Sequence, residues 1–105
     1  MGKYKYTPKQ IIHKPHYRFI LYGLRNDDMD INGIIDVLKS SGYKKTKCNN
    51  VVNMTYILMY ANLIIKNTNV NHQRIYSITE NGKKLIDAFA LECTANAIYK
   101  NLTIR

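Results

Sequence analysis

Residues 74–82 read RIYSITENG, from Arg74 to Gly82, and this stretch contains the signals for a strand and a helix in succession. Arg74 to Ile78 has the alternating character of a half-buried β-strand. Thr79 follows as the expected N-cap of a helix, whose first turn holds the next three residues as far as Gly82. A strand that leads directly into a helix is therefore predicted here.

The residues on either side of this stretch predict a hairpin and a long final helix. Leu63 to Lys66 is a short β-type run, and residues 67–73 are polar and turn-like. Together with the strand at 74–78, they predict a two-stranded hairpin with a polar tip. The last helix extends toward Leu102, and its apolar positions are Leu85, Ile86, Phe89, Cys93, Ala97 and Ile98.

Three helices are predicted before the hairpin. They cover residues 16 to about 26, residues 31 to about 40, and residues 48 to about 61, because apolar residues recur there at the i, i+3, i+4, i+7 spacing of one helical face. The inward-facing residues are expected to be Tyr17, Ile20, Leu21 and Leu24, then Ile31, Ile34, Ile35 and Leu38, then Val51, Met54 or Thr55, Leu58 and Ala61.

Residues that favour helix ends separate these segments. Asp28 or Asp30 is expected to cap the second helix, and Gly42 suits its C-terminal end. Thr46 is the expected N-cap of the third helix. Asn62 follows that helix, at a point where a left-handed residue is often needed and asparagine tolerates it.

Length and charge limit what the chain can do. Its 105 residues are enough for one domain, and a large enzyme architecture such as an α/β barrel cannot fit. Sixteen Lys and Arg residues against seven Asp and Glu residues give a formal net charge of +9. This excess favours a polyanionic partner, with nucleic acid first and an anionic membrane surface second.

Other functional classes receive no support from the sequence. Cys48 and Cys93 have no CxxC spacing, so no disulfide framework or zinc motif is predicted, and both are expected to be buried and inert. His13 and His16 lack a nearby third ligand for a metal. The apolar stretch 51–65 is too short to span a bilayer. We therefore expect no enzyme activity, cofactor, metal, membrane partner or identifiable small-molecule ligand, and a cytoplasmic, nucleoid-associated location.

The stretch 74–82 resembles a recurring segment of winged helix-turn-helix DNA-binding domains, in which an Arg-x-Tyr-x-Leu strand leads into a Thr-Glu-x-Gly helix start. Ile78 stands in place of the leucine. Ala61-Asn62-Leu63-Ile64 is similar to the Gly-Leu-Ile that follows the recognition helix in many such domains, with Asn62 in place of the glycine. The resemblance covers about residues 16–90. PadR-like regulators and small archaeal winged-helix proteins are the nearest groups, and both carry a C-terminal dimerisation helix.

The resemblance implies an α+β, mostly helical fold: a winged helix-turn-helix with a three-helix core, a two-stranded β-wing and a long C-terminal helix. The expected divisions are a basic and aromatic N-terminal arm at 1–15, the winged helix-turn-helix domain at 16–82 and a dimerisation helix at 83–105. Three interpretations of the arm remain open. These are a disordered tail, a segment that packs on a partner subunit, and a segment that follows a DNA groove.

The helix at 48–61 is then the recognition helix, since a helix about 10–12 Å across fits the major groove of B-DNA. Lysines before it would lie near phosphates, asparagine amides can pair with adenine edges, and the wing would reach the adjacent minor groove or its phosphates. The expected DNA-binding residues are Lys44, Lys45, Thr46, Lys47, Asn49, Asn50, Asn53, Tyr56, Asn69, Asn71, His72 and Arg74.

A structural interpretation of these residues stands beside the functional one. The lysines could form a solvated turn, and the asparagines could reflect a composition that is rich in asparagine throughout. The acidic cluster at 27–30 is expected to cap and solvate the second helix, away from the groove.

The last helix carries apolar residues beyond what the core needs. On a monomer this continuation would be exposed, so a two-fold dimer is expected to cover it. The alternative is that the helix folds back on its own domain. The expected dimerisation residues are Phe89, Leu91, Cys93, Ala97, Ile98 and Leu102.

The function predicted from these features is double-stranded DNA binding by a homodimeric transcriptional regulator. A second possibility within DNA binding is an architectural or plasmid-partition protein that coats DNA with little sequence specificity. A possibility of another class is a protein–protein docking module, because winged helices also serve that purpose.

Overall fold

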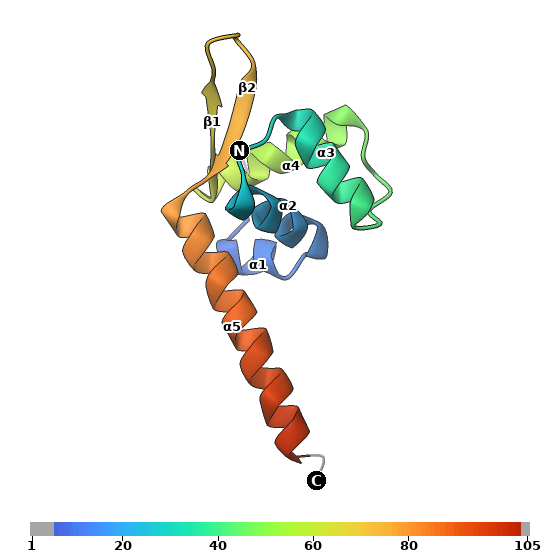
Figure 1. The fold of residues 1–105 in the computed structure, drawn as a ribbon, viewed down its shortest axis with the longest axis vertical. Coiled ribbons are helices and arrows are strands. Elements are labelled where there is room, and N and C mark those ends of the chain that lie inside the picture. Colours follow the sequence, from blue (N-terminus) through green and yellow to red (C-terminus); the bar gives the residue numbers. More distant parts are fainter. Residues whose placement is uncertain (1–5, 104–105) are drawn as a thin grey trace.

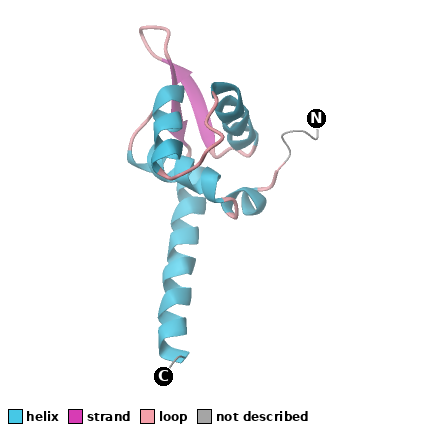
Figure 2. Cartoon of the chain, turned by 90° about the vertical axis from the view of Figure 1, so that its right-hand side faces the viewer, coloured by secondary structure: helices cyan, strands magenta, loops and turns pink. Residues whose placement is uncertain are grey.

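A computed structural model describes residues 6–103 of the chain, with side chains described for residues 6–95. Helices form a body from which a hairpin extends at one end and the last helix at the other (Figures 1 and 2). In chain order the elements are α1 (Pro8–Ile12), α2 (Pro15–Asn26), α3 (Ile31–Ser40), α4 (Cys48–Tyr60), β1 (Ile64–Thr68), β2 (Arg74–Ile78) and α5 (Glu80–Thr103).

Most of the predicted helix ends are confirmed. The Asp30 carboxylate accepts a hydrogen bond of 2.8 Å from the amide of Gly33 and so caps α3. The Thr79 hydroxyl accepts one of 3.0 Å from the amide of Gly82 at the start of α5. Asn62 adopts φ 60°, the left-handed conformation expected after α4.

One predicted cap is wrong. The N-cap of α4 is Lys47, with extended φ −61° and ψ 141°, and not Thr46. The first turn of α4 therefore begins one residue later than the capping preference of threonine suggested. In the described structure the Lys47 side chain makes no capping hydrogen bond, so the first amides of α4 are left for other acceptors.

The expected arm becomes part of the domain at residue 8. The Thr7 hydroxyl accepts a 3.2 Å hydrogen bond from the amide of Gln10, whose side chain accepts one of 2.9 Å from the amide of Thr7. This capping box starts α1. Ile11 is fully buried and Ile12 is 5% exposed, so both belong to the core. Residues 8–12 therefore differ from the expected arm because the two isoleucines are buried where α1 packs on α2 and α5. Residues 1–5 of the expected arm lie outside the described part of the chain.

The core lies where α1 to α4, the base of the hairpin and the first turns of α5 meet. Its members on α2 to α5 fall on the predicted faces, α1 adds Ile11 and Ile12, and the hairpin adds residues from its base. The buried apolar residues are Ile11, Ile12, Tyr17, Ile20, Leu21, Leu24, Ile34, Leu38, Val51, Met54, Leu58, Leu63, Ile64, Tyr76 and Ile86. Burial raises the pKa of the Tyr17 hydroxyl to about 12, so this tyrosine is neutral at neutral pH.

A one-residue strand joins the α2–α3 turn to the hairpin. The strands β1 and β2 pair antiparallel, with Ile64 opposite Ile78 and Thr68 opposite Arg74. On the other edge of β2, the Tyr76 amide donates to the Met29 carbonyl at 2.7 Å, and the Met29 amide donates back to Tyr76 at 3.1 Å. The hairpin is thereby attached to the helical body by main-chain hydrogen bonds as well as by its apolar base.

Both cysteines are exposed, which contradicts the prediction that they are buried. Cys48 is the first residue of α4, outside the buried stripe that begins at Val51, and Cys93 lies on α5 beyond the core. Within residues 6–103, no cluster of His, Cys, Asp and Glu side chains has the size needed to hold a metal ion. In the same part of the chain, no helix combines the length and apolar character that crossing a membrane requires.

Candidate nucleic-acid interface

Burial on one side of α4 determines which side chains the other side presents. Val51 and Leu58 are fully buried, and Met54 and Thr55 lie beside them in the core. Because a helix turns once every 3.6 residues, the opposite face is exposed. That exposed face includes Tyr60, and we call its four predicted DNA-contact residues, Asn49, Asn50, Asn53 and Tyr56, the α4 outer face.

The link between α3 and α4 places three lysines beside the start of this face. Lys44, Lys45 and Lys47 are exposed, while Thr46 is half-buried. The link is held in place by Tyr43, whose amide donates to the Leu38 carbonyl at 3.0 Å. Three positive charges thus lie next to the unpaired amides of the α4 N-terminus, a combination that attracts anions.

A stacked ring pair fastens the same link to α2. The rings of His16 and Tyr43 lie 4.9 Å apart at an angle of 18°. Burial, together with the charge of Lys14, lowers the pKa of His16 below its usual 6.5. Both effects favour the neutral form of the imidazole in this stack.

The hairpin packs on α4 through β1 and on α3 through β2. Asn69, Asn71, His72 and Arg74 are all exposed, as expected of a wing. The Asn69 side-chain oxygen, however, accepts hydrogen bonds from the amides of Asn71 at 2.9 Å and Gln73 at 3.0 Å. The side-chain oxygen of Asn69, which was expected to contact DNA, is therefore used to shape the loop. Asn71, His72 and Arg74 are the exposed residues that remain as candidates for DNA contact.

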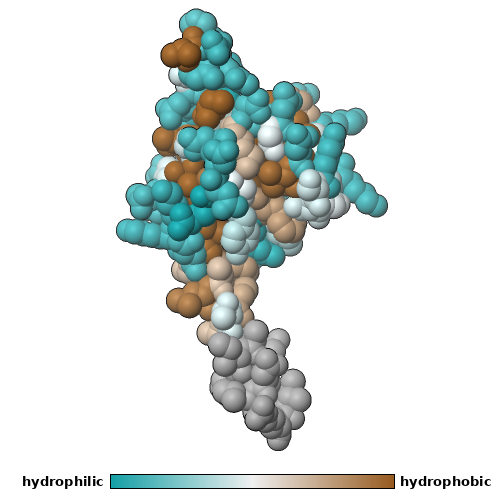
Figure 3. All heavy atoms as spheres, viewed as in Figure 1, coloured by the Kyte–Doolittle hydropathy of each residue, from teal (hydrophilic) through white to brown (hydrophobic). Residues whose placement is uncertain are grey.

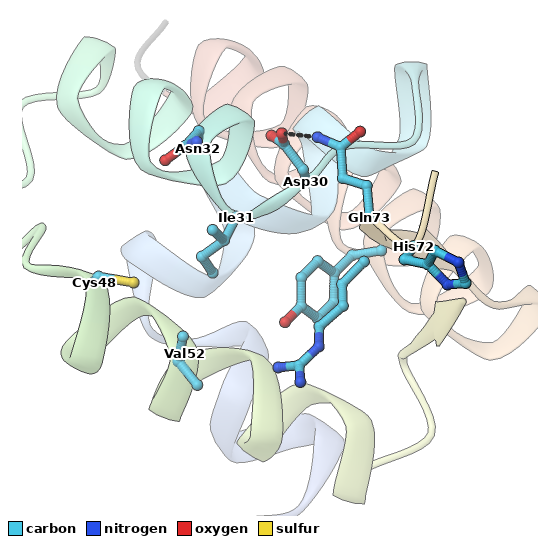
Figure 4. A pocket seen from close by; sticks show the side chains of 9 residues that line it. Asp30, Ile31, Asn32, Cys48, Val52, His72 and Gln73 are labelled. Carbon is cyan, nitrogen blue, oxygen red and sulfur yellow. Dashed lines mark hydrogen bonds between the residues drawn. The ribbon is translucent and has the colours of Figure 1, made fainter. Parts of the chain in front are cut away.

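A groove of about 390 Å³ separates the hairpin from α4 (Figure 4). At one side Gln73 donates a 2.7 Å hydrogen bond to Asp30, while Cys48 and Val52 line the opposite side. The full lining is Asp30, Ile31, Asn32, Cys48, Val52, His72, Gln73, Arg74 and Tyr76. On α4 the groove is lined by Cys48 and Val52, beside the α4 outer face rather than on it.

The acidic turn at 27–30 was expected to lie away from the DNA-binding surface, and the position of Asp30 in the groove contradicts this. One of its oxygens caps α3 and the other accepts from Gln73, and the residue lines the groove. The cap was predictable from the turn sequence, but the second contact joins residues 43 positions apart and has no local signal. Asp30 and Gln73 are thus residues of the site that sequence reasoning missed.

Tyr56 and Lys66 connect α4 with the first strand of the hairpin. The ammonium of Lys66 lies 5.8 Å from the centre of the Tyr56 ring, within range of a cation–π contact. Tyr56 is 37% exposed, so part of the ring is accessible from solvent. The α4 outer face therefore continues onto β1 with a further positive charge.

The predicted dimerisation residues on α5 fall into three groups by their exposure in the described structure. Phe89 is half-buried against its own domain, with the Arg18 guanidinium 4.7 Å from the centre of its ring. Leu91 is 72% exposed and Cys93 is also exposed. The side chains of Ala97, Ile98 and Leu102 lie outside the described residues. Phe89 thus packs partly on its own domain, and the dimer stays a prediction.

The comparisons with known proteins concern the fold. No family model matches the sequence, and no curated protein matches it either. A solved structure described as "Crystal structure of Possible transcriptional regulator for arsenical resistance" is similar over 96% of this chain and 98% of that chain, with a TM-score of 0.65 and 11% sequence identity. At this identity the likeness concerns architecture alone. Together with the observed order of helices and strands, it identifies the fold of this chain as an α+β, mostly helical winged helix-turn-helix.

Proposed function

We propose that the chain binds double-stranded DNA, with the α4 outer face in the major groove and the hairpin as the wing. The observation that carries this proposal is the position of four polar, exposed residues on one face of α4, directly after three exposed lysines. Asparagine amides can donate to and accept from the edge of adenine, and lysines neutralise phosphates. Lys66 and Arg74 extend the positive charge along the hairpin on either side of the loop.

We propose further that the chain acts as a homodimeric transcriptional regulator. The similar solved protein is described as a possible transcriptional regulator, which favours this role over the others. A dimer through α5 would cover Leu91 and Cys93, and would also use Ala97, Ile98 and Leu102. Two recognition helices related by a two-fold axis would then contact successive major grooves about 34 Å apart.

The lysines of the link provide the first test. Replacing Lys44, Lys45 and Lys47 together by alanine should lower the affinity for DNA at about 0.1 M salt by roughly tenfold to a hundredfold. The slope of log K against log salt concentration should fall by about one for each phosphate that is no longer neutralised, hence by about three. Fluorescence anisotropy with a labelled duplex across a salt series measures both quantities.

A second set of three lysines serves as the matched control. Lys9 on α1 and Lys83 and Lys84 on α5 lie on two helices that pack against each other, and none of them belongs to the link before α4. Changing these three to alanine removes the same charge but should leave the slope nearly unchanged. Equal effects of the two triple variants would mean that net charge alone attracts DNA, and that the orientation proposed for α4 is wrong.

The same titration separates the alternative functions. A regulator should bind one site in its own promoter region at least about a thousandfold more tightly than random DNA. A coating or plasmid-partition protein should bind both about equally, with steep salt dependence. If the wild-type chain binds no DNA at low salt, both are excluded and a protein–protein docking role is favoured.

The proposed dimer predicts a large effect of charge at Leu91. Leu91→Lys should weaken the dimer at least about tenfold, because burying an unpaired ammonium in an apolar interface is unfavourable. Sedimentation equilibrium measures this directly. Asn81→Lys places the same charge in the first turn of α5, where the helix packs on its own domain, and should leave the association unchanged. A wild-type chain that stays monomeric, or a Leu91→Lys variant that associates normally, would exclude α5 as the interface.

A further inference from the structure

An apolar side chain stands at the tip of the hairpin. Val70 is 94% exposed, the largest exposed fraction among the exposed large apolar residues of the described chain. Figure 3 shows apolar atoms close to the outer end of the hairpin, surrounded by hydrophilic ones. Single exposed apolar residues are common on protein surfaces, so exposure alone carries no argument. The structure and the charge of the surrounding loop are what indicate a function for this valine.

The loop that presents Val70 is braced from within. The Asn69 side chain makes three hydrogen bonds within the loop, two accepted from main-chain amides and one donated to the Gln73 side chain at 3.4 Å. The main chain adds two more, since the Asn69 amide donates to the Gln73 carbonyl at 2.9 Å and the His72 amide donates to the Asn69 carbonyl at 3.0 Å. His72 adopts φ 60°, which closes the turn. None of these bonds needs a side chain at position 70. A turn usually uses glycine, asparagine, aspartate or serine at such positions, so the valine is not explained by the turn.

The braced loop is also anchored to the helical body. Gln73 donates to Asp30 at 2.7 Å, and Asp30 itself caps α3. The tip is therefore tied to the start of α3, which itself packs against α4. A side chain held in this way loses little conformational freedom when it enters a groove, which favours binding.

The charge of the loop is unusual for a surface that contacts phosphates. Residues 67–73 read NTNVNHQ and contain no lysine, arginine or acidic residue. The nearest cations, Lys66 and Arg74, flank the loop on the two strands. Phosphates would be bound by those cations, whereas a tip of amides and valine is better suited to the interior of a groove. Amides can donate to the acceptors on the minor-groove floor, and apolar side chains enter between base steps there.

We infer that Val70 is an apolar wedge that enters the DNA minor groove beside the major-groove site of α4. This inference rests on the proposed DNA-binding function and deepens it. The flanking cations hold the two phosphate backbones, Asn71 and His72 face the groove walls, and Val70 contacts the floor. A wedge in this position favours sequences whose minor groove is free of the guanine N2 amino group and whose base steps separate easily.

Two DNA polymers test the inference directly. Alternating inosine–cytosine and guanine–cytosine duplexes present the same major-groove groups, but only the latter has the N2 amino group in the minor groove. The wild-type chain should prefer the inosine polymer by about fivefold or more, because the amino group obstructs the wedge. Val70→Ser should reduce this preference to nearly one, and Val70→Ile should retain it.

Two further measurements make the result specific. The salt slope of Val70→Ser should equal that of the wild type, because the valine neutralises no phosphate. Its thermal midpoint should also be unchanged, because the valine is almost fully exposed. Wild-type binding without preference between the polymers, or a preference that survives in Val70→Ser, would overturn the wedge and leave the proposed function intact. Failure of the wild-type chain to bind either polymer at low salt would overturn both.

Discussion

Replacing Ile11 by alanine is expected to lower the free energy of unfolding by about 2–5 kcal/mol. Ile11 is fully buried in the core, although it belongs to a five-residue helix near the N-terminus. Alanine would remove three carbon atoms from a closely packed site and leave a cavity that the neighbouring helices cannot fill completely. Urea denaturation followed by circular dichroism measures the change, provided that the slope of the transition stays the same.

Ile65→Ala is the matched control for this variant. It deletes the same atoms, but Ile65 is 47% exposed on β1, so the decrease should be about 1 kcal/mol or less. If Ile11→Ala were no more destabilising than Ile65→Ala, α1 would be an arm outside the core, as the sequence alone suggested.

Replacing Gly82 by alanine is also expected to destabilise the fold, by about 1–3 kcal/mol or more. Gly82 lies in the first turn of α5, where helix propensity alone would favour alanine by up to about 1 kcal/mol. The added Cβ would however collide with the backbone carbonyl oxygen of Leu63 and come within 2.7 Å of Cγ1 of Ile78. Main-chain atoms cannot move aside as a side chain can, so the steric cost exceeds the propensity gain.

Gly23→Ala separates this steric cost from a general effect of glycine substitution. Its Cβ would meet Cε of Met29 at 2.9 Å and Cγ2 of Val37 at 3.2 Å, and the methionine end can move away. The net change should stay within about 1 kcal/mol of zero. Thermal and urea transitions of the two variants, measured side by side, should rank Gly82→Ala well below Gly23→Ala. The reverse order would mean that α5 does not approach the Leu63 carbonyl as closely as described.

Several parts of the fold were predictable because their signals are local. The buried faces of α2 and α4 follow from apolar residues at helical spacing, and the caps Asp30 and Thr79 act within three residues of their own position. Asn62 shows the same principle, since its tolerance of a left-handed backbone is a property of the residue itself.

The candidate interface was predictable to a similar extent. Once Val51 and Leu58 are buried, the helical period requires Asn49, Asn50 and Asn53 to be exposed. The sequence could not indicate that Asn69 would use its side-chain oxygen within the loop, because that depends on a turn geometry that several polar residues could adopt.

Other features depend on partners far away in the chain. A five-residue helix such as α1 is unstable in isolation, and it becomes a core element only through burial of Ile11 and Ile12. The bridge between Met29 and Tyr76 involves one residue on each side, so it leaves no periodic pattern to detect. The contact between Asp30 and Gln73 likewise joins segments that meet only after folding.

The amino-acid sequence was thus sufficient for the order of α2 to α5 and the two strands, for the inward faces of those four helices, and for most of the points where they begin and end. These properties arise from interactions between residues a few positions apart, which the chain carries in any conformation. The tertiary structure was needed for the inclusion of α1 in the core, the attachment of the hairpin through Met29 and Asp30, and the exposure of both cysteines. These depend on the distances between segments remote in sequence, and such distances exist only once the hydrophobic core has brought those segments together.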